Sequence, residues 1–201
     1  MQTRIQSLIQ STKLGEALPD AEYGSCFGRA IAAPPGRVWE ALFDLRVSDL
    51  TVSKPLILAR YPWRRLSKYP RLTDPGGVAD PIHADPPRSA CSGFVSRVWE
   101  PTQQRGPQFA GLDELRAFSE PGWLKLGMDM QLTELPGHRT YLQVATLCEP
   151  TDDVARARFR PYWAFIQPFS ALIRLDLLAA VARRAAAARP VSLVGQPAAD
   201  A

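Results

Sequence analysis

Apolar and polar residues alternate most regularly between Trp123 and Glu134. A period of two is typical of a β-strand that turns one face to the core. A turn at residues 136–139 follows, and Thr140–Cys148 resumes the alternation. The two segments predict an antiparallel hairpin. The apolar positions of its first strand are Leu124, Leu126, Met128, Met130 and Leu132.

A long helix is predicted from Asp152 to Arg189, with Asp152 or Thr151 as its N-cap and Pro190 as its end. Its apolar stripe has spacings of three, four and seven, which place the side chains on one face. The stripe comprises Phe159, Trp163, Ile166, Ile173, Leu177 and Val181.

Two prolines, Pro161 and Pro168, fall inside this helix. Each removes a backbone donor and crowds the preceding turn, at a cost of about 3 kcal/mol in a helix interior. We therefore expect the helix to be kinked or split near both. A kink would either shape the mouth of a cavity or follow the curvature of a sheet, and we favour the second.

The remaining segments are shorter and several are ambiguous. We expect a strand at Tyr23–Ala33, a helix at Gly36–Leu45 and a strand at Ser89–Glu100. Arg64–Arg88 is rich in proline and glycine and predicts a long loop. Lys54–Arg60 and Gln108–Phe118 are each compatible with a strand or a short helix.

One domain is expected at residues 21–189, because no break in composition divides a chain of 201 residues. Residues 1–20 are interpreted as an N-terminal arm, either a short helix or a loose segment. Residues 190–201 are small and polar and predict a disordered tail.

This order of elements predicts an α+β fold. Sequential strands without helical crossovers pair antiparallel, and such a sheet must bury one face. The long C-terminal helix, with its wide apolar stripe, is suited to lie across a curved sheet. That arrangement tends to leave a cavity between helix and sheet.

Three stretches resemble an uncharacterised, polyketide cyclase-like bacterial branch of the SRPBCC superfamily, also called START or Bet v 1-like. They are Ala33–Leu45 (APPGRVWEALFDL), Gly93–Pro101 (GFVSRVWEP) and Thr151–Arg174 (TDDVARARFRPYWAFIQPFSALIR), and the likeness extends over about residues 22–188. The resemblance implies a helix-grip fold with a cavity for a hydrophobic small molecule. It brings no catalytic motif that could be transferred residue by residue.

Composition narrows the functional classes. The net charge of +4 comes from scattered arginines without interleaved aromatic and basic motifs, so we expect no nucleic-acid partner. No window reaches 18 apolar residues, so we expect no stable membrane insertion. Cys26, Cys91 and Cys148 are far apart and are interpreted as small buried residues of a cytoplasmic, reducing environment. The oligomeric state stays open.

Motifs for chemistry are missing from the sequence. His83 and His138 lie beside turn-forming residues, and no histidine or cysteine pair has metal-ligand spacing. No serine lies in a GxSxG elbow, and neither a GxGxxG nor a Walker sequence is present. We therefore name no catalytic residue, no metal and no cofactor.

The candidate ligand-binding residues are apolar, with one arginine. Alternation places Asp129 on the strand face opposite the methionines, which we interpret as outside, with a polar ligand anchor as the alternative. Arg97 shares a strand face with Val95 and Trp99, so it either extends to the edge or meets a buried acid. The cavity residues we expect are Trp99, Met128, Met130, Phe159, Trp163, Ile166 and Arg97.

Our leading hypothesis is a domain that binds a hydrophobic small molecule or lipid without chemistry of its own. The first alternative is a cyclase or dehydratase-like enzyme, which needs two or more inward polar groups near one another. The second is an adaptor whose basic C-terminal helix meets an acidic protein or membrane surface. The arginines concerned are Arg156, Arg158, Arg160, Arg174, Arg183 and Arg184.

Overall fold

The computed structural model describes residues 2–60, 71–75, 79–102 and 104–187. Its strands are β1 (Tyr23–Ile31), β2 (Pro81–Asp85), β3 (Ser89–Arg97), β4 (Gln104–Arg105), β5 (Leu124–Leu135) and β6 (Arg139–Pro150). Its helices are α1 (Gln2–Ser11), α2 (Lys13–Ala17), α3 (Pro35–Phe43), α4 (Lys54–Arg60), α6 (Leu112–Ala117) and α7 (Asp153–Ala187), with a 3-10 turn, η1, at Val47–Asp49. The predicted tail at 190–201 and part of the predicted loop lie outside the described residues.

The strands form one open antiparallel sheet with the order β1-β6-β5-β3-β2, and β4 pairs with β3. The predicted hairpin is present: β5 and β6 pair from Leu124 with Pro150 to Leu135 with Arg139. Gly137 and His138 have positive φ at its turn, a conformation that a hairpin of this kind favours.

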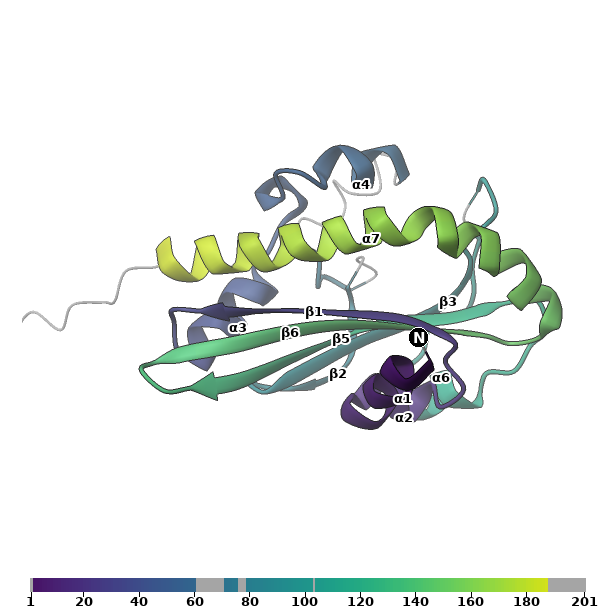
Figure 1. Cartoon of the computed structure of the whole chain (residues 1–201), viewed down its shortest axis with the longest axis horizontal. Coiled ribbons are helices and arrows are strands. Elements are labelled where there is room, and N and C mark those ends of the chain that lie inside the picture. Colours follow the sequence, from purple (N-terminus) through teal and green to yellow (C-terminus); the bar gives the residue numbers. More distant parts are fainter. Residues whose placement is uncertain (1, 61–70, 76–78, 103, 188–201) are drawn as a thin grey trace, which may run out of the picture.

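The sheet separates two helical layers (Figure 1). Helix α7 runs along one face, with α3 packed beside its C-terminal part and α4 lying over it. Helices α1, α2 and α6 lie on the opposite face. The α7 side is called the inner face below, and the α1 side the outer face. An open antiparallel sheet held along one face by a long C-terminal helix is the helix-grip fold that the family resemblance implied.

Helix α7 is continuous, with Pro161 and Pro168 both inside it. Of the two predicted outcomes the split is therefore wrong, whereas a kink is compatible with the bend of the helix over one end of the sheet (Figure 1). Asp152 is the N-cap, since its Oδ1 accepts a hydrogen bond of 2.7 Å from the Ala155 N–H.

The C-terminal half of α7 belongs to the largest core cluster. Leu177 and Val181 pack there with Val38 of α3 and with Leu142 and Met130 of the sheet. All five side chains are buried. This half of the helix is therefore filled scaffold, and free space has to be sought beneath the other half.

The segment predicted as a short helix or a loose arm contains two helices, α1 and α2, between residues 2 and 17, and they cover the outer face. Leu14 is completely buried against it, beside Leu147. The close approach requires Gly127, because a Cβ there would lie 2.2 Å from the Ser92 carbonyl oxygen and 2.8 Å from Leu14 Cδ1.

Asp129 lies on the outer face, as the alternation predicted, but it is not exposed to solvent. Its side chain is 1 % exposed beneath α2, and its Oδ2 accepts a hydrogen bond of 3.1 Å from the Leu14 N–H. The N-terminal helices cover it, which strand periodicity cannot indicate.

Several shorter segments differ from their predictions. Strand β2 lies within the segment predicted as a loop, and His83 is therefore a strand residue. The ambiguous segments Lys54–Arg60 and Gln108–Phe118 contain helices α4 and α6. Cys26 is exposed on edge strand β1, whereas the other two cysteines are buried as expected.

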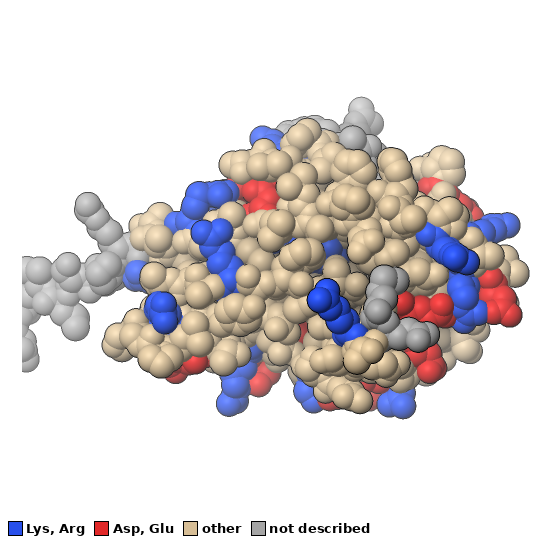
Figure 2. Space-filling view, in the orientation of Figure 1, with Lys and Arg blue, Asp and Glu red and all other residues tan. Residues whose placement is uncertain are grey.

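Charged side chains of both signs are mixed on one face of the molecule. On the face shown in Figure 2, lysine and arginine lie scattered among acidic residues rather than in a continuous stripe. This agrees with the interpretation of the net positive charge as dispersed.

Candidate functional site

A cavity of about 370 Å³ lies between the N-terminal half of α7 and the inner face of the sheet. A side hollow of about 220 Å³ adjoins it, and the two share Phe94, Leu126, Thr146, Ile173 and Arg174 in their walls. Volumes of this order suit a small organic molecule.

The cavity exists because the inner face carries small side chains beneath this half of the helix. Ser92, Thr146 and Cys148 line the two hollows. At the other end of β6 the same face carries Leu142 and Val144, which are fully buried and fill the space. The size of alternate residues along one strand thus decides where α7 stands away from the sheet.

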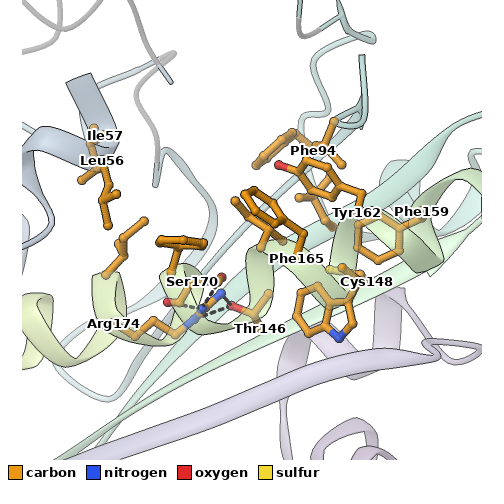
Figure 3. Close-up of a pocket in the computed structure, with 16 residues that line it drawn as sticks. Leu56, Ile57, Phe94, Thr146, Cys148, Phe159, Tyr162, Phe165, Ser170 and Arg174 are labelled. Carbon is orange, nitrogen blue, oxygen red and sulfur yellow. Dashed lines mark hydrogen bonds between the residues drawn. The ribbon is translucent and has the colours of Figure 1, made fainter. Parts of the chain in front are cut away.

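An aromatic wall closes the cavity on the α7 side. Phe159 and Trp163 are buried and held edge-on by Tyr23 of β1, with ring centroids 4.9 and 5.9 Å away. Phe165 also lines the cavity although its side chain is 69 % exposed, so it stands at the mouth (Figure 3). Aromatic side chains held in this way offer an apolar body of fixed shape.

The roof of the cavity comes from α4, which contributes Leu56 and Ile57. Asp176 of α7 fixes the start of this helix by accepting hydrogen bonds from the backbone N–H groups of Val52 and Ser53, at 2.9 and 2.8 Å. It also accepts from the hydroxyls of Thr51 and Ser53. The carboxylate therefore serves as a helix cap supplied from another element.

One charged side chain, Arg174, lies in the shared wall of the two hollows. Its Nε donates to Thr146 Oγ1 at 2.8 Å, and Nη2 donates to the same oxygen. Nη1 donates to the carbonyl oxygen and the hydroxyl of Ser170, at 2.6 and 2.7 Å. Figure 3 shows the three side chains grouped at one end of the aromatic lining.

The Arg174 guanidinium has no counter-ion among the described residues. Its side chain is 8 % exposed, and no ion pair within the described part of the chain involves it. Burial lowers the pKa of Arg174 to about 10, still far above neutrality, so the group is cationic. The cavity wall therefore contains a positive charge that is removed from water and hydrogen-bonded to the neutral oxygens of Thr146 and Ser170.

The groups that line the cavity are poor acid–base catalysts. The described lining residues of both hollows include no carboxylate and no imidazole. Burial raises the pKa of the Cys148 thiol to about 12, so it is protonated at neutral pH. Over the described ranges, no group of three or more His, Cys, Asp or Glu could hold a metal ion.

Five of the seven predicted site residues divide among three places. Phe159, Trp163 and Ile166 line the larger cavity, and Met128 lines the side hollow. Met130 lies in the filled core beside α3.

Trp99 and Arg97 line neither hollow. Trp99 packs against the cluster that contains Phe159, and its indole N–H is buried without a partner among the described residues. Arg97 points to the outer side, where it stacks 4.5 Å from the ring of Trp123 and donates to the Gly122 carbonyl oxygen. It meets no buried acid there, because its partners are an aromatic ring and neutral oxygens.

The sequence reasoning missed Arg174, Thr146 and Ser170. A usable signal was present, because Arg174 follows Ile166 by eight residues and precedes Leu177 by three. That spacing places an arginine within the apolar stripe. Its charge alone groups Arg174 with the surface arginines of the same helix.

A further surface hollow of about 830 Å³ lies between α1 and α7. Its lining includes Asp20, Glu22, Gln167 and Arg160, which suits water better than an apolar molecule.

Helix α7 is long and apolar enough to cross a membrane by length and composition alone. The core helix of a soluble protein passes the same test, and one such helix is weak evidence.

The fold and the site together define a class: a helix-grip domain with an apolar cavity that has one cation, Arg174, among its described lining residues. The structure is similar to that of TTHA0849 from Thermus thermophilus, at 14% identity over 84% of this chain and 100% of that chain, with a TM-score of 0.37. It is also similar to the Zhui aromatase/cyclase from Streptomyces sp. R1128, at 15% identity over 84% and 99%, with a TM-score of 0.33. No family model and no curated protein sequence matches the chain. The fold assignment rests on the strand order and the position of α7.

Proposed function

We propose that this chain is a cytoplasmic member of the SRPBCC superfamily that binds a hydrophobic small molecule beneath α7 without transforming it. The observation that carries the proposal is the cavity of about 370 Å³ with its aromatic wall and its lack of an acid–base pair among the described lining residues. The three free cysteines fit a reducing compartment.

Binding can be tested with a neutral apolar dye and a variant that fills the cavity. We expect Ile166→Trp to reduce dye binding at least tenfold, because Ile166 lines the cavity and the larger ring would occupy it. The matched control is Ala157→Trp, which places the same ring at an exposed position of α7. Native mass spectrometry of the protein from its own cell extract would identify a retained ligand. An empty protein that also binds no dye would overturn the proposal.

A cyclase or dehydratase-like enzyme is the second candidate. The observation in its favour is the group of inward polar side chains formed by Arg174, Thr146 and Ser170. Such a group could orient a substrate carbonyl, but proton transfer near neutral pH also needs a base of matching pKa. The described lining residues offer none, so we rank this function below binding. Recovery of a chemically altered compound from the native protein would reverse that order.

An adaptor role is the least supported. Arg156 pairs with Glu22 and Asp153, and Arg184 pairs with Asp49. Arg174 faces the cavity instead of solvent. The arginines of α7 therefore do not present one free basic face to an acidic partner.

A further inference from the structure

We propose that the ligand is an amphiphilic monoanion whose carboxylate pairs with Arg174 while its apolar body lies against the aromatic wall. The inference rests on the proposed function, since it names the chemical class that the same cavity selects.

The first argument is the charge. A buried guanidinium without a counter-ion is costly, because neutral hydrogen-bond acceptors replace water only in part. If Arg174 served only to hold α7 on β6, an uncharged polar or apolar side chain would do so at lower cost. A ligand of single negative charge would neutralise the site.

The second argument is the excess of hydrogen-bond donors. A guanidinium has five N–H bonds, and each hydroxyl adds one donor. One N–H of Nη2 and the hydroxyl hydrogens of Thr146 and Ser170 have no acceptor among the described residues. Both hydroxyl oxygens already accept from Arg174, so their hydrogens are free to point elsewhere. A group that only accepts, such as a carboxylate, completes this cluster, whereas an alcohol or an amine brings more donors.

The third argument is position. Arg174 lies where the two hollows share a wall, at one end of the aromatic lining, and Phe165 stands at the mouth. A carboxylate at Arg174 would leave the rest of the molecule among Phe94, Phe159 and Phe169. The lining thus suits a molecule with one charged end and one apolar body. The body can be an aliphatic chain or a fused aromatic ring, and the test below distinguishes them.

Calorimetric titration at neutral pH would compare two matched pairs of probes: decanoate with decan-1-ol, and 2-naphthoate with naphthalen-2-ylmethanol. We expect the acid of at least one pair to bind about 10- to 100-fold more tightly than its alcohol, the range for a charge-assisted hydrogen bond. The pair of probes with the higher affinity shows whether the apolar part of the ligand is an aliphatic chain or a fused aromatic ring.

Two variants assign that preference to Arg174. Arg174→Met removes the charge and keeps an unbranched apolar side chain, so it should abolish the preference for the acid and leave alcohol binding within about threefold. Arg174→Lys should retain part of the preference, since it keeps the charge but not the planar fork. The control is Arg158→Met, an exposed position on the same helix, which should change neither affinity.

The possible failures are separable. Equal binding of acid and alcohol by the natural protein would overturn the carboxylate inference and leave the proposed function standing. Binding of no probe by the natural protein would contradict the proposed function itself. If Arg174→Met also fails to bind the alcohol probe, the Arg174→Lys variant provides the test. A retained preference of this variant for the acid over the alcohol supports the inference, and loss of that preference overturns it.

Discussion

Asp176 on α7 and Ser53 at the start of α4 are 123 residues apart, yet the carboxylate accepts hydrogen bonds of 2.8 Å from both the backbone N–H and the hydroxyl of Ser53. This pair ties the helix that roofs the cavity to the helix that walls it. The ligand site therefore depends on a contact that does not itself touch the cavity, which makes Asp176 a positioning residue.

Replacing Asp176 by Ala should lower the free energy of unfolding by about 1–3 kcal/mol, because it leaves buried donors at the start of α4 without an acceptor. It should also weaken dye binding through displacement of Leu56 and Ile57. Urea unfolding and dye titration would measure the two effects. Leu175→Ala, a change at an exposed neighbour on α7, is the control and should stay within about 0.5 kcal/mol.

The same carboxylate should make stability depend on acid pH. Burial acts to raise the pKa of Asp176, but hydrogen bonds from Ser53 and Thr51 outweigh it and lower that pKa. A carboxyl whose pKa is lower in the folded protein stabilises the fold fully at pH values above its ordinary pKa of 3.8. That contribution to the free energy of unfolding is lost as the pH falls through the pKa of the folded state. Asp176→Asn should therefore lose more stability at neutral pH than at about pH 2. A deficit that stays constant across this range would contradict the assignment.

Asp129 should behave in the opposite way. Burial raises its pKa, and the hydrogen bond from Leu14 offsets this only in part. A carboxyl whose pKa is higher in the folded protein contributes less to the free energy of unfolding as the pH rises from about 3.8 through the pKa of the folded state. Asp129→Asn should therefore be at least as stable as the natural protein at neutral pH, with the difference vanishing in acid. Urea unfolding over a pH series would measure it, and a less stable Asn variant at neutral pH would refute the argument.

Gly127 and Gly36 offer a matched pair of glycine substitutions. Gly127→Ala should cost about 1–3 kcal/mol, because its Cβ would meet the Ser92 carbonyl oxygen and Leu14, and the N-terminal helices would have to shift. Gly36→Ala, in the first turn of α3 with nothing within 4 Å of the added carbon, should stabilise by about 0.4–1 kcal/mol. Thermal unfolding of both variants would check the opposite signs.

Two aromatic residues should separate stability from binding. Phe159→Ala should cost about 3–5 kcal/mol, because it empties a fully buried position. Phe165→Ala should change stability by less than about 0.5 kcal/mol, since most of its ring is exposed, yet weaken dye binding at the mouth. Equal dye affinity for Phe165→Ala and the natural protein would remove Phe165 from the site.

Much of the fold could be predicted because its signals are local. Alternation from Leu124 to Leu132 defined β5, and the stripe from Phe159 to Val181 defined α7. Strand β2 is an exception, because its five residues adjoin a proline-rich segment and carry no clear strand pattern. Its pairing with β3 stabilises it as a strand. The prolines of α7 indicated a kink or a split, and local propensity could not decide between the two. The helix stays continuous because its packing outweighs the cost of the prolines.

The candidate site was predicted only in its apolar part. Phe159, Trp163 and Ile166 follow from the stripe, since an apolar face must meet the sheet. Met130 and Met128 share one strand face, but α3 fills the space beside the first and leaves a hollow beside the second. Periodicity identifies the face of a residue and does not indicate what packs above it.

The sequence by itself determined the long hairpin strands and the C-terminal helix and which face of each is apolar, because these depend on neighbours along the chain. The tertiary structure alone decided that Arg174 meets Thr146 with no counter-ion in the described part of the chain, that Asp176 caps α4 and that Asp129 is buried by the N-terminal helices. Each of these depends on the packing of segments between 28 and 124 residues apart, and such packing sets the burial and the partners of a charge.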